Sequence, residues 1–252
     1  MKLLMTGILM LTLTATANAA EIGGFGVSVL VGESPRAEYH ARGNVYVEAV
    51  RGQEYSLRVT NPTPYRVAVA LSVDGLNTID GKHTGATNAS KWVLEPYEST
   101  VITGWQVNES IARRFFFTNE PNSYGASLGQ TNNLGVIEAV FYREKHREIA
   151  VYGSRKDAAR AQEAPTSREA QNGVVAAPAP AQDYAATGMG QQTGNEVQLV
   201  DINLESTPAA SVRIRYEFRP ELIKLGVFAV DPMQRREHAR GFCPEPTSLR
   251  QR

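Results

Sequence analysis

The sequence predicts an all-β protein, an antiparallel β-sandwich, and two observations indicate this fold. From Phe25 to Tyr142, short apolar stretches are separated by turn residues about every ten positions, which is typical of sandwiches and barrels and not of amphipathic helices. In the run Val212–Phe218, apolar and charged side chains alternate, as they do in a strand with one buried face.

The first nineteen residues, 1–19, have the composition of a secretory signal peptide. Lys2 precedes an apolar run that ends near Leu13, and Ala17-Asn18-Ala19 supplies the small residues that a signal peptidase reads, so we expect cleavage before Ala20. The run is shorter than the ~20 residues needed to cross a bilayer, which disfavours a membrane anchor. We therefore expect a periplasmic or secreted protein with no transmembrane segment after cleavage.

Residues 20–145 are predicted to form the main β domain. The segment Tyr55–Val59 alternates between apolar and polar residues, and Asn61–Pro64 then interrupts it because proline cannot donate a hydrogen bond to a sheet. The next segment, Tyr65–Val73, is apolar on both faces, which predicts a central strand.

Turn residues divide the rest of this domain. Asp74-Gly75 and Asp80-Gly81 each predict a turn. Further strands are predicted at Lys91–Leu94, Ser99–Gln106, Arg113–Thr118 and Leu134–Arg143. The third of these contains Phe115-Phe116-Phe117, and because successive side chains on a strand point to opposite faces, at least one of these rings must point away from the main core.

The composition changes after this domain. Residues 146–194 are rich in Ala, Pro, Gly and Gln and contain few large apolar side chains, so we expect a disordered, flexible insertion. Residues 195–230 are predicted to complete the domain with a hairpin, Val197–Leu204 and Val212–Phe218, and a short C-terminal helical segment that begins at Pro220. The tail, 231–252, is predicted to be loosely ordered.

Charge and cysteine content exclude several classes of function. The chain has 26 Lys and Arg against 26 Asp and Glu, and this balance argues against a nucleic-acid partner, which would require clustered basic residues. The single cysteine, Cys243, excludes a disulfide within the chain and a cysteine-based zinc site. The four histidines are too far apart for a compact metal motif, and the chain has no cofactor fingerprint, so no metal or cofactor is expected.

Several short motifs resemble a family of secreted bacterial β-sandwich-like proteins with no assigned activity. They are the segments Leu71–Asn77, Trp92–Tyr97, Gly104-Trp105, Ser123–Ala126 and Asn133–Ile137, with fainter similarity at Thr187–Gly190 and Tyr216–Val227. The resemblance covers about residues 45–143. It implies one domain with a signal peptide and assigns no catalytic residue.

Two groups of residues are the candidate ligand-binding residues, and no catalytic residue is predicted. Asp74, Asn77 and Asp80 offer oxygen atoms at three-residue spacing, which turn formation explains without a metal. Tyr97, Trp105 and Tyr124 are aromatic residues beside turns, where a ring can stay exposed to contact a ligand. Because loops of a sandwich gather at its two ends, we expect both groups to share one end.

Three functions are compatible with the sequence. The first is a non-enzymatic protein that binds an envelope glycan or a protein partner, or that has a structural role at the cell envelope. The second is a carbohydrate-active or other hydrolase whose carboxylates are brought together by the fold. The third is an assembly subunit that pairs an edge strand with a neighbour. The sequence leaves the oligomeric state open.

Overall fold

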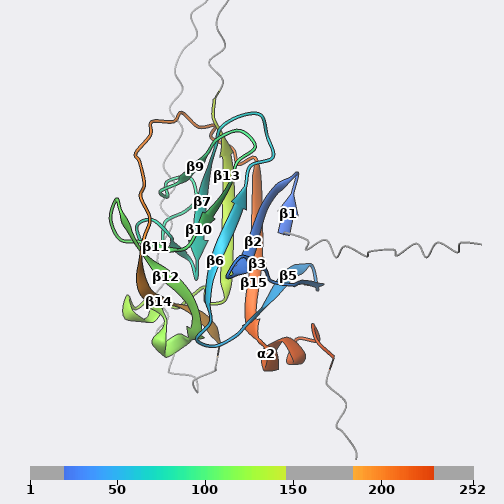
Figure 1. The fold of residues 1–252 in the computed structure, drawn as a ribbon. Coiled ribbons are helices and arrows are strands. Elements are labelled where there is room, and N and C mark those ends of the chain that lie inside the picture. The colour runs from blue at the N-terminus through green and yellow to red at the C-terminus, as the bar shows by residue number, and fades with distance from the viewer. Residues whose placement is uncertain (1–19, 146–183, 230–252) are drawn as a thin grey trace, which may run out of the picture.

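Two β-sheets pack face to face in the computed structural model, which describes residues 20–145 and 184–229 (Figure 1). The all-β sandwich predicted from the sequence is confirmed. The first sheet has eight strands: β1 (Ala20–Ile22), β2 (Phe25–Val31), β3 (Ser34–Pro35), β6 (Glu54–Thr60), β10 (Ser99–Ile102), β11 (Gly104–Gln106), β12 (Ile111–Asn119) and β14 (Ala185–Gly194).

The second sheet has seven strands. They are β4 (Glu38–Ala41), β5 (Asn44–Ala49), β7 (Val67–Val73), β8 (Leu76–Asn77), β9 (Trp92–Leu94), β13 (Val136–Arg143) and β15 (Ala210–Phe218). Its order is β4-β5-β15-β13-β7-β8, with β9 paired to β7. The pairing of β15 with β5 is parallel, and the other strand pairings of both sheets are antiparallel.

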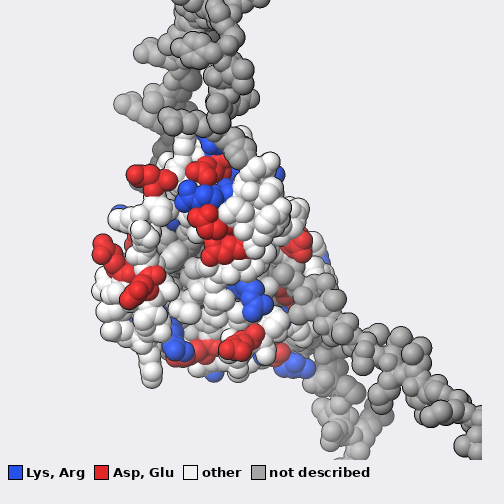
Figure 2. All heavy atoms as spheres, turned by 45° about the horizontal axis from the view of Figure 1, so that its top comes forward, with Lys and Arg blue, Asp and Glu red and all other residues white. Residues whose placement is uncertain are grey.

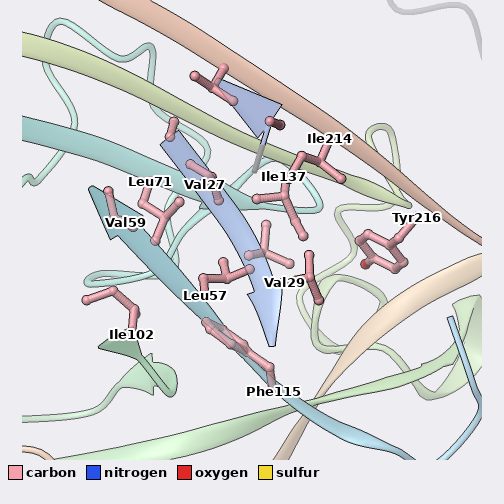
Figure 3. Close-up of a cluster of buried hydrophobic side chains, with 14 of the residues drawn as sticks. Val27, Val29, Leu57, Val59, Leu71, Ile102, Phe115, Ile137, Ile214 and Tyr216 are labelled. Atoms are coloured by element: carbon pink, nitrogen blue, oxygen red, sulfur yellow. The ribbon is translucent and has the colours of Figure 1, made fainter. Parts of the chain in front are cut away.

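One hydrophobic core lies between the sheets (Figure 3). Val29, Leu57 and Phe115 from the first sheet face Leu71 and Ile137 from the second, and all five are at most 1% exposed. Burying a side chain of this kind contributes about 1.5–3 kcal/mol, so this layer is the main source of stability of the fold.

The strand patterns seen in the sequence match the burial. In β7 both faces are covered, as expected for a central strand, and in β15 buried and exposed residues alternate. In β12, Phe115 and Phe117 are fully buried in the core, while Phe116 points to the other face of its strand and its ring covers Gly188 of β14. The prediction that one of the three rings leaves the main core is therefore correct.

The prediction of a flexible insertion over 146–194 is wrong at its C-terminal end, because residues 185–194 form β14. This strand pairs with β12 along its whole length, and Ala185, Ala186 and Thr187 have no exposed surface. The prediction rests on the small number of large side chains in this segment, which would bury little apolar surface. In the fold, small residues are what the position requires, because Phe116 and the Arg114 backbone lie against Gly188 and Gly190.

The predicted hairpin of Val197–Leu204 with Val212–Phe218 is also wrong. Strand β15 is enclosed by β13 and β5, which leaves no edge for a third strand. Residues 195–209 instead cross from the first sheet, where Val197 N–H donates to Glu109 O, to the second, where Leu204 forms an isolated bridge with Glu144. Leu199 is 90% exposed on this crossover, so the apolar residues of this segment do not indicate a buried strand face.

Three short helical segments complete the described residues. They are η1 (Glu120–Asn122), α1 (Tyr124–Ser127) and α2 (Arg219–Lys224). The helical turn predicted at Pro220 is confirmed in α2, where proline occupies the first turn and needs no hydrogen-bond acceptor for its nitrogen. The signal peptide, residues 146–183 of the insertion, the tail 231–252 and Cys243 lie outside the described residues, so their predictions stay untested.

On the face drawn in Figure 2, acidic and basic side chains are interspersed among uncharged ones. Several charges are paired across strands, as in the contact of Arg114 with Glu54 (3.0 Å) and that of Arg213 with Glu138 (3.6 Å). Exposed ion pairs of this kind contribute at most about 1 kcal/mol each to the free energy of unfolding, so they do not determine the fold.

Strands β11 and β12 of the first sheet approach each other closely at Gly104. A β carbon at this position would lie 1.9 Å from the carbonyl oxygen of Arg113, which is backbone and can move only with β12. We expect Gly104→Ala to lower the free energy of unfolding by about 1–3 kcal/mol in urea denaturation. Gly194→Ala is the matched control, because a β carbon there meets nothing within 4 Å. Equal losses in the two variants would contradict this explanation.

Candidate functional site

The turn between β7 and β8 is the starting point of the site. Asp74 and Gly75 have φ angles of 53° and 77°, so both lie in the left-handed region that a two-residue hairpin requires. Asp-Gly suits this turn because glycine has no side chain to strain and aspartate tolerates the conformation. The turn predicted from the sequence is confirmed, and it turns the Asp74 carboxyl inward, where the residue is 3% exposed.

A chain of buried hydrogen bonds ends at the Asp74 carboxyl. Its oxygens accept from the backbone N–H of Gly135 (2.9 Å) and of Thr187 (2.7 Å), and from the hydroxyl of Tyr216. The Thr187 hydroxyl lies 2.6 Å from both the Tyr216 hydroxyl and the Tyr55 hydroxyl. Because each hydroxyl has one proton and Tyr216 donates its own to Asp74, Thr187 must donate to Tyr216 and Tyr55 must donate to Thr187.

This chain, which we call the Asp74 network, joins the two sheets. Tyr55 and Thr187 belong to β6 and β14 of the first sheet, whereas Tyr216 belongs to β15 of the second and Asp74 follows β7. The Tyr55 ring also stacks on Phe117 with centroids 4.2 Å apart. The network therefore fixes the separation of the sheets at the end where β7 stops.

Burial changes the acid–base behaviour of the network. It raises the pKa of Asp74 from 3.8 to about 6, although the donors from Tyr216, Thr187 and Gly135 act in the opposite direction. Burial, together with the Asp74 charge, raises the pKa values of Tyr55 and Tyr216 well above their usual 10.0. At neutral pH the network thus holds one carboxylate and two protonated tyrosines.

The loop that follows, residues 74–83, is held by its own polar side chains. Asn77 is buried, donates through Nδ2 to Ser90 O (2.8 Å) and accepts from the backbone N–H of Ile79 (2.9 Å). Asp80 accepts from the backbone N–H of Lys82 (3.0 Å) and from the Ser90 hydroxyl (2.9 Å). These contacts stabilise one conformation of the loop.

Two glycines let neighbouring segments approach this loop. Gly75 lies against the Asn133 side chain and the His83 ring, and a β carbon at Gly75 would come within 2.9 Å and 3.2 Å of them. Gly81 lies against the Tyr124 hydroxyl, which would be 2.8 Å from a β carbon. The segment that carries α1 and the segment before β13 are therefore packed directly on the loop.

These three segments enclose an open cavity of about 410 Å³, which we call the loop-end cavity. Its lining includes one carboxylate, one ammonium group, one imidazole, one phenol ring and three carboxamides: Asp80, Lys82, His83, Tyr124, Gln130, Asn132 and Asn133. Asp74 and Leu128 also contribute to the wall. A second cavity of about 190 Å³ adjoins it and shares His83 and Asn133.

The predicted site residues do not form one surface. Asp74, Asp80 and Tyr124 line the loop-end cavity, although the Asp74 carboxyl is committed to the Asp74 network, and Asn77 is buried in the loop. Trp105 is 2% exposed, packs on Phe115 and Tyr124, and donates to Gly188 O, so the expectation of an exposed ring is wrong for it.

Tyr97 is 68% exposed but lies elsewhere. It follows β9, whose Leu94 pairs with Val67 at the start of β7, whereas Asp74 follows the end of the same strand. The expectation that Tyr97 shares an end of the sandwich with Asp74 is therefore wrong.

Five residues of the cavity were not anticipated: Lys82, His83, Gln130, Asn132 and Asn133. Two local signals could have indicated them. Lys82 and His83 directly follow the Asp80-Gly81 turn, and the last three cluster in a polar stretch between two apolar segments. Their convergence depends on contacts across the fold, which periodicity does not contain.

The described residues offer no cluster of three or more His, Cys, Asp or Glu side chains that could hold a metal ion. Within 20–145 and 184–229, no helix is long and apolar enough to cross a membrane. Comparisons with protein-family models, curated proteins and solved structures find no match to this chain. The function must therefore be inferred from the chemistry of the loop-end cavity.

Trp105 and Tyr97 differ in burial and should differ in the cost of truncation. We expect Trp105→Ala to lower the free energy of unfolding by about 3–5 kcal/mol, because it removes a ring from the core. Tyr97→Ala should change it by less than about 0.5 kcal/mol, since its ring is exposed. Urea denaturation of both variants tests this, and a large loss from Tyr97→Ala would contradict the placement of its ring.

The raised pKa of Asp74 predicts a pH dependence of stability. Between pH 3.8 and about 6 the folded chain keeps a proton that the unfolded chain has released. The free energy of unfolding should therefore fall as the pH rises through this window, by up to about 3 kcal/mol from Asp74. Below the window this contribution is fully present.

Asp74→Asn should remove this part of the slope in urea titrations made at a series of pH values. Glu38 and Glu217, whose pKa values are both raised to about 7 mainly by burial, should leave a residual slope of the same sign. A slope that is unchanged in Asp74→Asn would show that Asp74 is not the titrating group.

Proposed function

We propose that this protein is a non-enzymatic β-sandwich that binds a saccharide of the cell envelope in the loop-end cavity. The observation that supports this most is the convergence of three carboxamides, a carboxylate and a tyrosine ring around one open cavity. Ligand sites are typically concave and have a few convergent polar groups beside apolar surface. The proposal places the protein in the periplasm or outside the cell, supported by the leader-like sequence before Ala20.

The chemistry of the lining suits a polyhydroxylated ligand. Each carboxamide of Gln130, Asn132 and Asn133 offers two N–H donors and a carbonyl acceptor, so it can bond neighbouring hydroxyls that both donate and accept. The half-buried Tyr124 adds an amphipathic ring, which can cover the apolar face of a sugar. Lys82 and the carboxyl of Asp80 add charged partners at the rim of the same cavity.

Rigid support also favours binding. The loop of Asn77 and Asp80 is held by hydrogen bonds within the chain, and Tyr124 packs on the buried Trp105 ring. A site held in its binding conformation loses less conformational entropy when a ligand arrives.

The hydrolase alternative has one observation in its favour, the pKa of Asp74 near 6 in the wall of the cavity. Its hydrogen bonds argue against it. Both Asp74 oxygens accept from groups of the protein, and Asp80 is bonded to Lys82 N–H and Ser90. Glycoside hydrolysis needs two carboxyls that face the scissile bond, and these two are committed to the fold.

Titration calorimetry with tetrameric N-acetylglucosamine and with soluble peptidoglycan fragments tests the proposal. The double variant Gln130→Ala/Asn132→Ala removes two exposed carboxamides of the cavity. With about 0.5–1.5 kcal/mol lost per hydrogen bond, the two changes together should lower the affinity by about 5- to 150-fold.

Tyr97→Ala is the control variant, because Tyr97 is exposed and lies beyond the opposite end of β7. It should bind as the unaltered protein does. Absence of binding to both saccharide preparations, or equal losses in the control and the double variant, would contradict the proposed function.

A further inference from the structure

The residue that follows the expected cleavage point is part of the core. Ala20 is the first residue of β1, pairs with Val27 of β2 and is 3% exposed. Strand β1 lies at one edge of the first sheet, beside β2, and also contacts β15, an interior strand of the second sheet (Figure 1). The nitrogen of Ala20 therefore lies in a packed region.

That nitrogen faces a half-buried acidic side chain. The backbone N–H of Ala20 donates to the carboxyl of Glu38, the first residue of β4 in the second sheet. One oxygen of this carboxyl, Oε2, is buried and lacks a hydrogen-bond partner among the described residues. Burial raises the pKa of Glu38 to about 7, because one amide donor does not compensate for the loss of water. In the uncleaved chain, the Glu38 carboxyl therefore has too few hydrogen-bond donors to replace the water it loses.

Hydrolysis of the peptide bond between Ala19 and Ala20 would change the donor. Water adds across the bond, so that Ala19 leaves with a new carboxylate and Ala20 keeps its nitrogen as an α-amino group. This group is protonated at neutral pH, since its pKa is ordinarily about 7.7–8.0. One neutral N–H then becomes a cation with three donors beside the same carboxyl.

We propose that removal of the leader before Ala20 creates a structural ion pair between the new α-ammonium group and the Glu38 carboxylate, which fastens β1 to β4 in the mature protein. The inference rests on cleavage before Ala20 and is independent of the saccharide proposal. The pair makes processing a step in the completion of the fold: the released terminus supplies the charge and the donors that the Glu38 site lacks in the precursor.

A double-variant cycle tests the pair by thermal unfolding. One form begins at Ala20 and the other has one extra glycine before it, which moves the ammonium group by up to about 3.8 Å and restores an amide at Ala20. In the unaltered background the extra glycine should lower the melting temperature by about 2–6 °C. In a Glu38→Gln background, where the carboxylate is gone, the same extension should change it by less than about 1 °C. An equal shift in both backgrounds would overturn the proposal.

A second measurement holds even where Glu38→Gln does not fold. The pKa of the Ala20 α-amino group, followed by nuclear magnetic resonance on the protein that begins at Ala20, should lie above the ordinary range of about 7.7–8.0 because the carboxylate favours the charged form. A value within or below that range would overturn the ion pair. The intact mass of the exported protein tests the cleavage separately, and a mature chain that starts elsewhere would overturn the inference without affecting the saccharide site.

Discussion

The hydrogen bonds that end at the buried carboxylate of Asp74 hold the two sheets together at one end of the sandwich. This carboxylate lies after β7 in one sheet and accepts from Thr187 of the other sheet, and the hydroxyls of Tyr55, Thr187 and Tyr216 all donate in the direction of its charge. Aligned hydrogen bonds of this kind reinforce one another in a low dielectric. A buried charge is costly unless its donors are all present, so the network forms only when both sheets are correctly placed.

The loop-end cavity depends on this constraint. The two-residue turn sends the Asp74 side chain inward and the loop of residues 74–83 outward, and Gly75 then admits Asn133 and His83 on the other side of the same turn. The N–H of Gly135, two residues beyond Asn133, bonds to Asp74 itself. Asn133 and His83 are thus packed on the same turn that joins the sheets, which holds this side of the cavity in place.

The fold could be predicted further from the sequence than the site could. Alternation in β15, apolar character on both faces of β7 and the Asp-Gly turn are local signals, and each is present in the structure. Trp105 illustrates the limit, since a tryptophan beside a glycine can be exposed or buried, and only the packing of Phe115 and Tyr124 around it decides. The cavity is lined by residues that lie fifty positions apart in the sequence, such as Asp80 and Gln130. A single sequence does not indicate that the fold brings them to the same cavity.

Strand β14 shows why a prediction of disorder from composition can fail. A segment rich in Gly and Ala buries little apolar area of its own, which is the usual reason to expect disorder. In this sandwich the burial comes from the partner: the rings of Phe115 and Phe117 fill the core, and Phe116 on the reverse face needs a neighbour without a side chain, which Gly188 provides. Thr187 beside it has no exposed surface and links both tyrosines to the network. Small residues opposite large ones in a neighbouring strand therefore carry as much structural information as the large residues themselves.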